Sequence, residues 1–152
     1  LQVDFVLPDR LDANYVGEDG TKHKPVMLHR AVLGSFERFI GILLENYSGR
    51  LPLWLSPIQV GIATINDGCI DYSKQLKKML NSEKIRCILD ERNEKLNYKI
   101  RELTLQKIPY IVVIGEKEIK EKSVNLRIHG EPKQVSLKVE DFLKKLKNSC
   151  RT

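Results

Sequence analysis

The segment IQVGIATINDGCIDYSKQLKKMLNSEKIRCILD (residues 58–90) changes twice between two hydrophobic patterns. Residues 58–65 are a short apolar run, typical of a buried strand, and the NDG that follows is a turn signal. In residues 70–80 the apolar side chains recur at the spacing of a helix, and residues 85–90 are again strand-like. The order strand, helix, strand predicts a right-handed crossover between two parallel strands.

The same alternation continues beyond this segment. It predicts a helix at residues 96–107, a third strand at 110–115, a fourth strand at 124–128 and a final helix around 139–146. A charged turn joins the last two strands and is too short for a crossover helix, so the fourth strand is expected to run antiparallel. The predicted fold class is α/β, with a mostly parallel mixed sheet flanked by helices.

The stretch GRLPLWLSP (residues 49–57) marks a boundary in the chain. Pro52 and Pro57 interrupt regular structure and push the residues before them toward extended geometry. The apolar side chains between the two prolines indicate a packed connection. The predicted organisation is a first domain at residues 1–50, a linker at 51–57 and a second domain at 58–152.

Charge is distributed unequally along the chain, whose 152 residues carry a formal net charge of +6. Residues 1–57 hold 6 Lys and Arg against 7 Asp and Glu, whereas residues 58–152 hold 20 against 13. A lysine-rich solvated surface is the simpler explanation of a surplus of this size. A polyanionic partner of the second domain is the alternative.

Composition excludes several classes of protein. No apolar run reaches the roughly 18 residues that span a bilayer, so no membrane association is expected. The three cysteines are widely spaced and form no CxxC pair, which favours reduced thiols and a cytoplasmic location. The chain begins without methionine and within what reads as structure, and we expect it to be a piece of a longer protein.

Before the boundary, the sequence predicts strands at residues 1–7 and 25–31 and a helix at residues 35–47. Ser35 is a plausible N-cap of this helix. The intervening stretch contains Gly and Asp-Gly turn signals. The first domain is therefore expected to combine short strands with one amphipathic helix.

Two side chains near this helix are candidate ligand contacts. Arg38 lies in the first turn, where its cation opposes the partial positive charge of the helix N-terminus. A bound phosphate or purine would compensate, because guanidinium groups bind phosphate and stack on planar rings. The alternative is a surface arginine paired with Glu37 or Glu45. His29 is a candidate metal ligand or substrate contact, with a hydrogen-bonded core histidine as the alternative.

Two polar stretches of the second domain are candidates for nucleic-acid binding. DERNEKLNYKIRE (residues 90–102) spans a strand end and a helix start, where ligands tend to bind in α/β sheets. Its Asn and Arg side chains suit base edges, and its Tyr suits stacking on an unpaired base. GEKEIKEKSVNLRI (residues 115–128) holds Glu118 and Arg127, which suit a base amino group and guanine. The alternatives are a solvated helix face and an ordinary charged hairpin.

Longer stretches carry a resemblance to a known family. VMLHRAVLGSFERFIGILLENYSGRLPLWLSPIQV (residues 26–60) resembles the motif 3 region of threonyl-tRNA synthetases, which are class II aminoacyl-tRNA ligases. LDERNEKLNYKIRELTLQKIPYIVVIGEKE (residues 89–118) resembles their anticodon-binding domain. The likeness covers essentially the whole chain. It implies an anticodon-binding domain preceded by a partial class II catalytic domain of antiparallel strands and the motif 3 helix. The family's N-terminal and editing domains and motifs 1 and 2 have no counterpart here.

The resemblance also implies roles for residues of the first domain. Arg38 matches the motif 3 arginine, which packs over the adenine of ATP and helps to neutralise its phosphate. Gln2 and Ser35 fall where the family lines its adenylate pocket. His29 matches the third ligand of a zinc ion that reads the amino and hydroxyl groups of threonine. The other two ligands, a Cys and a His, lie outside this chain.

For the second domain, the resemblance implies contacts with the anticodon of tRNA(Thr). The matching residues are Asn93, Lys95, Arg101, Glu118 and Arg127. The implied activity is ATP- and magnesium-dependent activation of L-threonine and its transfer to tRNA(Thr) by a homodimeric enzyme, of which this fragment alone is expected to be inactive. Two alternatives remain at this point: a freestanding RNA-binding module without catalysis, and a protein-interaction or regulatory subunit.

Overall fold

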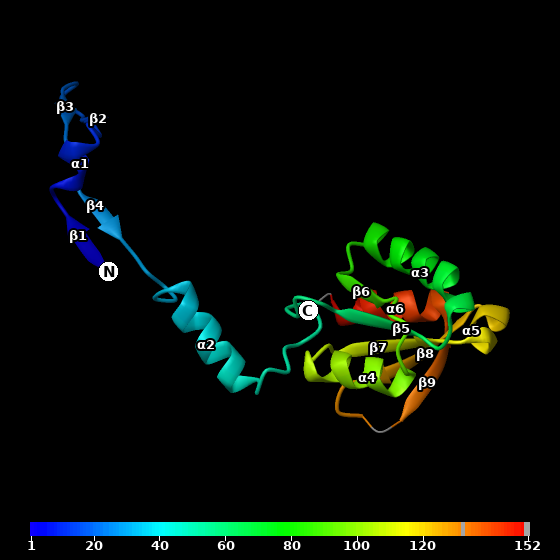
Figure 1. Cartoon of the computed structure of the whole chain (residues 1–152). Helices are drawn as coiled ribbons and strands as arrows, with labels where there is room; N and C mark the ends of the chain where they lie inside the picture. Colours follow the sequence, from blue (N-terminus) through cyan, green and yellow to red (C-terminus); the bar gives the residue numbers. More distant parts are fainter. Residues whose placement is uncertain (132, 151–152) are drawn as a thin grey trace. The chain divides into compact units, whose positions relative to one another are not determined.

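The computed structural model describes residues 1–131 and 133–150. The chain divides into two compact units, Leu1–Leu43 and Leu44–Thr152, which are described separately below. The larger unit carries the α/β fold, and the smaller one consists of short strands and helical segments (Figure 1).

The smaller unit contains two antiparallel strand pairs, as the resemblance implied. Strand β1 (Gln2–Asp4) pairs with β4 (Met27–His29), and β2 (Tyr15–Val16) pairs with β3 (Lys22–His23). Strand β1 is shorter than predicted. Its last residue accepts hydrogen bonds at Oδ1 from the N–H groups of residues 6 and 7, both 2.9 Å, and this turns the chain into the short helix α1 (Leu7–Arg10).

The predicted motif 3 helix is α2 (Phe36–Asn46), and its predicted cap is confirmed. The backbone N–H of Arg38 donates to Ser35 Oγ at 3.3 Å, which satisfies one of the free donors of the first turn. Beyond the helix, Gly49 has φ +72° and its N–H donates to Leu44 O at 2.9 Å. No residue of α2 is buried: Phe39 and Leu43 are half-buried, and its other apolar side chains are exposed within the described chain.

The larger unit is built on a five-stranded sheet with the order β6-β5-β7-β8-β9. The two pairings of β5 with β6 and β7 are parallel, whereas β7–β8 and β8–β9 are antiparallel. The predicted mixed sheet and its antiparallel fourth strand are thus confirmed. The strands are β5 (Val60–Thr64), β6 (Cys87–Asp90), β7 (Tyr110–Ile114), β8 (Ser123–Ile128) and β9 (Gln134–Lys138).

Helices cover both faces of this sheet (Figure 1). On one face, α3 (Ile70–Ser82) and α6 (Val139–Ser149) contribute fully buried leucine and phenylalanine side chains to the main core. On the other face, α4 (Leu96–Leu105) packs Leu103 against Ile111 and neighbouring residues in a smaller cluster. Each such buried side chain stabilises the fold by about 1.5–3 kcal/mol.

Two elements differ from the sequence expectations. The segment after β7 was expected to be a charged turn, but it forms the helix α5 (Glu116–Glu121), which ends at Lys122 with φ +49°. Its N-terminus is capped because Glu118 Oε2 accepts the N–H of Gly115 at 2.9 Å. Strand β9 was not predicted, since its side chains are mostly exposed and polar at alternate positions, without an apolar run.

The connection at residues 51–57 is fastened to the sheet by one arginine. Arg86 Nη2 donates to Trp54 O at 2.9 Å and to Ser56 O at 2.8 Å. Its Nε donates to Ser56 O and to Pro57 O, both at 3.1 Å. The predicted packed connection is therefore confirmed, and hydrogen bonds hold it in addition to its apolar side chains.

Candidate nucleic-acid interface

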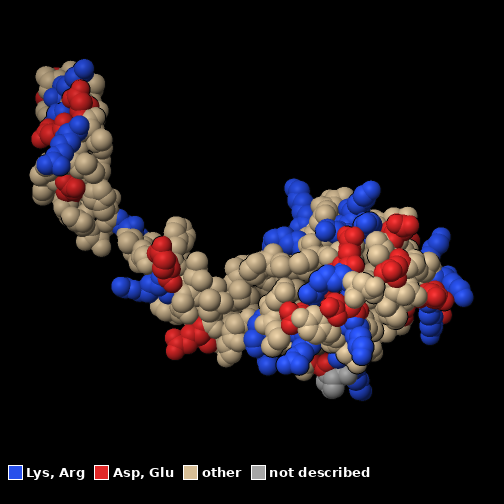
Figure 2. Space-filling model, viewed as in Figure 1, with Lys and Arg blue, Asp and Glu red and all other residues tan. Residues whose placement is uncertain are grey.

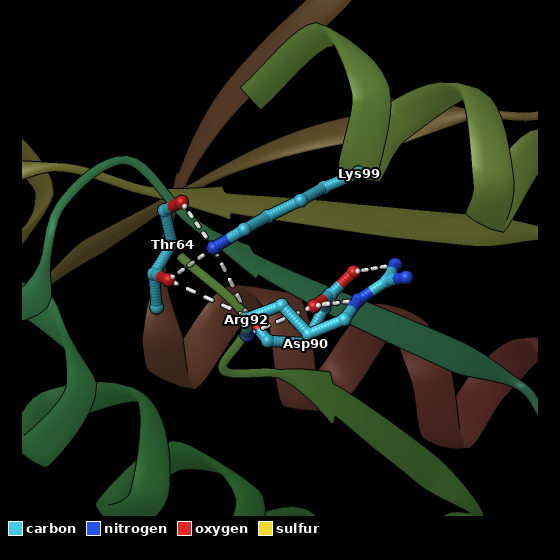
Figure 3. A network of polar contacts seen from close by, with 4 residues as sticks. All are labelled: Thr64, Asp90, Arg92 and Lys99. Atoms are coloured by element: carbon cyan, nitrogen blue, oxygen red, sulfur yellow. Dashed lines mark hydrogen bonds and ion pairs between the residues drawn. The ribbon is translucent and has the colours of Figure 1, made fainter. Parts of the chain in front are cut away.

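A buried lysine ties together the carboxyl ends of two parallel strands and the start of α4 (Figure 3). Lys99 is only 3% exposed. Its Nζ donates to Thr64 Oγ1 at 3.0 Å, to Thr64 O at 3.2 Å and to Asp90 O at 3.3 Å. The sequence placed this lysine among the basic side chains of a candidate binding stretch, but the structure gives it a positioning role. It fixes the edge of the sheet from which the loop to α4 departs.

The same edge carries an aspartate–arginine pair. Arg92 Nε and Nη2 donate to the two carboxylate oxygens of Asp90 at 2.9 and 2.6 Å, and the backbone N–H of Arg92 donates at 3.1 Å. These hydrogen bonds, with the charges of Arg92 and Lys99, hold the pKa of Asp90 below its usual value although burial opposes this. The carboxylate in turn raises the pKa of Arg92. The guanidinium lies 5.6 Å from the ring centre of Tyr98, which keeps it in place.

Three predicted contact residues lie near this edge. Asn93 and Lys95 are exposed in the loop between β6 and α4, and Lys95 is the N-cap residue of α4. Arg101 is exposed on α4 itself. The loop and the first turns of α4 thus present polar side chains to solvent above the fixed pair of Asp90 and Arg92.

The other two predicted contact residues are separated along the sheet. Glu118 is bound to the N–H of Gly115, at the carboxyl end of β7. Arg127 on β8 is paired with Ile111 on β7, and Ile111 lies four residues before Gly115. At about 3.3 Å per residue, Ile111 and Gly115 are about 13 Å apart along the extended chain. They therefore do not form one compact pair.

The register of the last strands reveals a polar surface that sequence reasoning missed. In β8, Val124 and Leu126 belong to the main core, so the alternate residues point to the opposite face. Their partners on β9 share that face through the pairs Asn125–Ser136 and Arg127–Gln134. We call this surface the polar strip: Asn125, Arg127, Gln134, Ser136 and Lys138. The only sequence signal of the polar strip is the alternation of apolar and polar residues in β8, and that alternation does not identify a surface unless β9 is known to pair with it.

The first unit places its four predicted site residues at two positions. Gln2 and His29 lie opposite each other in the β1–β4 pair, and both are exposed. Ser35 and Arg38 lie at the start of α2, and both are also exposed. The structure thus brings them together in two pairs.

The residues around His29 do not by themselves make a zinc site. His29 Nε2 lies 3.3 Å from Asp4 Oδ2, and hydrogen bonds from the backbone of residues 7 and 6, then His29, lower the pKa of that carboxyl. Within residues 1–131 and 133–150, no three His, Cys, Asp or Glu side chains gather as metal ligands would. A tetrahedral zinc site at His29 would need ligands from outside this chain.

The surface of the larger unit mixes charges. In the view of Figure 2, Lys and Arg side chains are spread around it with acidic groups between them. Its positive charge is therefore not one continuous basic field on this face, and specific contacts carry more weight than net charge. None of the helices in the described parts of the chain has the length and apolarity needed to cross a bilayer.

Comparison with known proteins identifies both parts of the chain. Residues 59–149 match the family model of the anticodon binding domain, and residues 1–47 match the tRNA synthetase class II core domain (G, H, P, S and T). A threonine–tRNA ligase of Caulobacter sp. (strain K31) is 58% identical over 96% of this chain and 22% of its own length. One of Clostridium novyi (strain NT) is 50% identical over 97% of this chain and 23% of its own.

A solved structure agrees with these sequence relatives. The RNA binding domain of threonyl-tRNA synthetase from Cryptosporidium parvum Iowa II matches with a TM-score of 0.79 and 34% identity, over 97% of this chain and 38% of that chain. The chain spans less than a quarter of the length of the two bacterial relatives, 22% and 23%. The family match covers more than half of the chain, and together with the α/β sheet it shows that the chain belongs to the anticodon-binding domain family, with threonine–tRNA ligases of the class II synthetases as its relatives.

Proposed function

We propose that this chain is part of a threonine–tRNA ligase and supplies the motif 3 helix and anticodon recognition. The observation that carries the proposal is the identity of 58% and 50% with two bacterial threonine–tRNA ligases over nearly the whole chain. The proposed division is a catalytic piece at residues 1–50, a linker at 51–57 and an anticodon-binding domain at 58–152. The separate family matches at residues 1–47 and 59–149 support it.

The proposed reaction has two steps. The carboxylate of L-threonine attacks the α-phosphate of magnesium-bound ATP, which forms threonyl-adenylate and releases pyrophosphate. A ribose hydroxyl at the 3′ end of tRNA(Thr) then attacks the threonyl carbonyl, which forms the ester and releases AMP. Arg38 is proposed to stack on the adenine and to neutralise phosphate charge, with Gln2 and Ser35 beside the adenylate. The exposure of all three side chains supports this, since a substrate can reach them. No step proposed here passes through a zinc ion at His29.

The proposed anticodon surface combines the loop after β6 with the β7–β8 part of the sheet. Asn93, Lys95 and Arg101 would contact the RNA near the fixed edge, while Glu118 and Arg127 would read bases. Glu118 caps Gly115 and Arg127 pairs with Ile111, and the separation of about 13 Å between Gly115 and Ile111 supports contacts with different nucleotides. The intact enzyme is proposed to be a cytoplasmic homodimer.

Anisotropy titration of a labelled tRNA(Thr) anticodon stem-loop with the full chain tests the RNA proposal. The stem-loop should bind more tightly than one with a changed anticodon, and binding should weaken steeply as salt rises. Arg127→Ala should cost about 1–3 kcal/mol if Arg127 makes a bidentate base contact. The exposed Lys78→Ala, on α3, is the matched control. Equal affinity for both stem-loops, or equal losses in the two variants, would refute base reading by Arg127.

Catalysis is tested separately by pyrophosphate exchange. The full chain with ATP, magnesium and threonine should show no exchange, because it matches less than a quarter of its bacterial relatives' length, 22% and 23%. An identical assay on the product of the complete gene should show threonine-dependent exchange. Exchange by the chain alone would contradict the first expectation, and none by the complete product would leave a freestanding RNA-binding module as the better description.

A further inference from the structure

A small cavity lies at the end of the sheet opposite the fixed edge of Asp90 and Lys99. Its volume is about 280 Å³. Arg50 lines it from the segment before the linker, Thr104 from α4, and Arg127 from β8. The turn after β8 closes it with residues 128–131, among them His129 and Glu131. Segments far apart in the sequence thus converge on a space large enough for a phosphate group.

The cations at this cavity have few counter-charges. Within the described residues, no ion pair includes Arg50, Arg127 or the nearby Lys107. Glu131 is the acidic residue of the lining. A Cβ atom on Gly130 would lie 3.8 Å from Arg50 Nη1, so the guanidinium of this exposed arginine lies beside the turn. The Arg50 guanidinium has five N–H donors and can donate several hydrogen bonds to one anion here, while Arg127 adds positive charge beside it.

His129 adds a third group that lacks a partner. Its backbone N–H is held by Pro109 O at 2.8 Å, while its Nδ1 is buried without a hydrogen-bond partner among the described residues. Burial, and then the positive charges of Arg50 and Lys107, lower the pKa of its imidazole. An anion in the cavity would oppose the effect of these positive charges on the imidazole.

We propose that this cavity binds a backbone phosphate of the RNA strand whose bases contact the polar strip. The proposal rests on the proposed function, because it assumes that RNA lies on that strip. Arg127 belongs to both surfaces, so a strand that crosses the strip arrives at the cavity. Arginine matches a phosphate with its planar fork of donors. The contact would position the strand without reading its sequence.

The test compares RNA binding by the full chain and by Arg50→Gln, with Lys78→Gln as the control. Arg50→Gln should weaken the cognate stem-loop and one with a changed anticodon by the same factor, on the order of tenfold. It should also reduce the slope of log K against log salt by about 1. Arg50→Lys should retain the slope, since it keeps the charge. Unfolding midpoints of the three variants should match that of the wild type, which shows that the fold is intact.

A second readout uses inorganic phosphate as the probe. His129 is one of three histidines in the chain, and NMR titration should show its pKa rising when phosphate is added. An Arg50→Gln effect no larger than that of Lys78→Gln, with RNA still bound by the wild type, overturns the phosphate site alone. If added phosphate left the pKa of His129 unchanged, the phosphate site alone would also be overturned. A wild-type chain that binds no RNA overturns the RNA-binding proposal as well.

Discussion

Replacing Arg86 by methionine tests how the connection at residues 51–57 is held. Four hydrogen bonds of 2.8–3.1 Å join its guanidinium to three backbone carbonyls. The bonds to Trp54 and Pro57 lie in exposed surroundings, where water replaces the donor, whereas Ser56 O is partly buried. A bond to a charged donor contributes about 1.5–3 kcal/mol, so the loss should be near one such bond, about 2 kcal/mol. Methionine keeps most of the apolar stem, which limits the packing loss.

The assay is thermal unfolding of the full chain, followed by circular dichroism and by the fluorescence of its single tryptophan, Trp54. A loss of about 2 kcal/mol lowers Tm by about 8 °C for a unit of roughly 100 residues. Because Trp54 lies in the connection, its fluorescence in Arg86→Met should change before the helical signal does. Arg86→Lys should recover part of the stability, since an ammonium reaches fewer of the carbonyls at once.

The control is Lys78→Met, which removes an exposed cation from α3. Its Tm should change by no more than about 2 °C, as for other surface substitutions. If Arg86→Met also changed Tm by so little, the hydrogen bonds would contribute nothing beyond what water supplies. The connection would then be held by its apolar side chains alone.

Two further predictions concern the sheet. The pKa of Asp90 is lowered in the folded state, so its ionised carboxylate stabilises the fold at pH values above its ordinary pKa near 3.8, and this stabilisation is lost as pH falls through the folded-state pKa. In urea unfolding from pH 6 to 2.5, the free energy of unfolding of Asp90→Asn should therefore fall less steeply with acid than that of the wild type. Parallel curves for the two proteins would exclude this contribution. A Cβ on Gly61 would approach Leu103 Cδ1 and Cδ2 at 3.1 Å, so Gly61→Ala should destabilise the fold by about 1–3 kcal/mol. Gly68→Ala is the control, because a Cβ on Gly68 would lie 3.6 Å from its nearest neighbour. If the two variants had equal free energies of unfolding, the Leu103 side chain would move aside at no cost.

The parts of the fold that could be predicted are those in which burial is uniform or strictly periodic. Strands β5 and β7 are buried at every position and are apolar except for Thr64 at the end of β5. Strand β9 is exposed at four of its five positions, and α5 consists mainly of charged residues, so neither forms an apolar run. They are stabilised instead by pairing with β8 and by the Glu118 cap, which depend on tertiary placement and on a single side chain.

The candidate site likewise has parts that could be predicted from the sequence and parts that could not. The loop with Asn93 and Lys95 was predictable because a strand end followed by a helix start is visible in the sequence. The burial of Lys99 was not, since lysine usually lies in solvent and its three acceptors come from two strands. The cavity beside Arg127 also escaped prediction. Its lining comes from four separate segments, and no local pattern places Arg50 beside His129.

In β8, alternate residues face opposite sides of the sheet, so the side on which a residue lies depends on whether its position is odd or even. Arg127 faces the proposed RNA side only because it is an odd number of residues from Leu126 and Val124, which are buried in the core. Losing or gaining one residue ahead of Arg127 would turn the arginine inward and an aliphatic side chain outward. Evolution could therefore lengthen this strand only in steps of two, and each step would move the arginine by about 7 Å relative to the β7 end that holds Glu118.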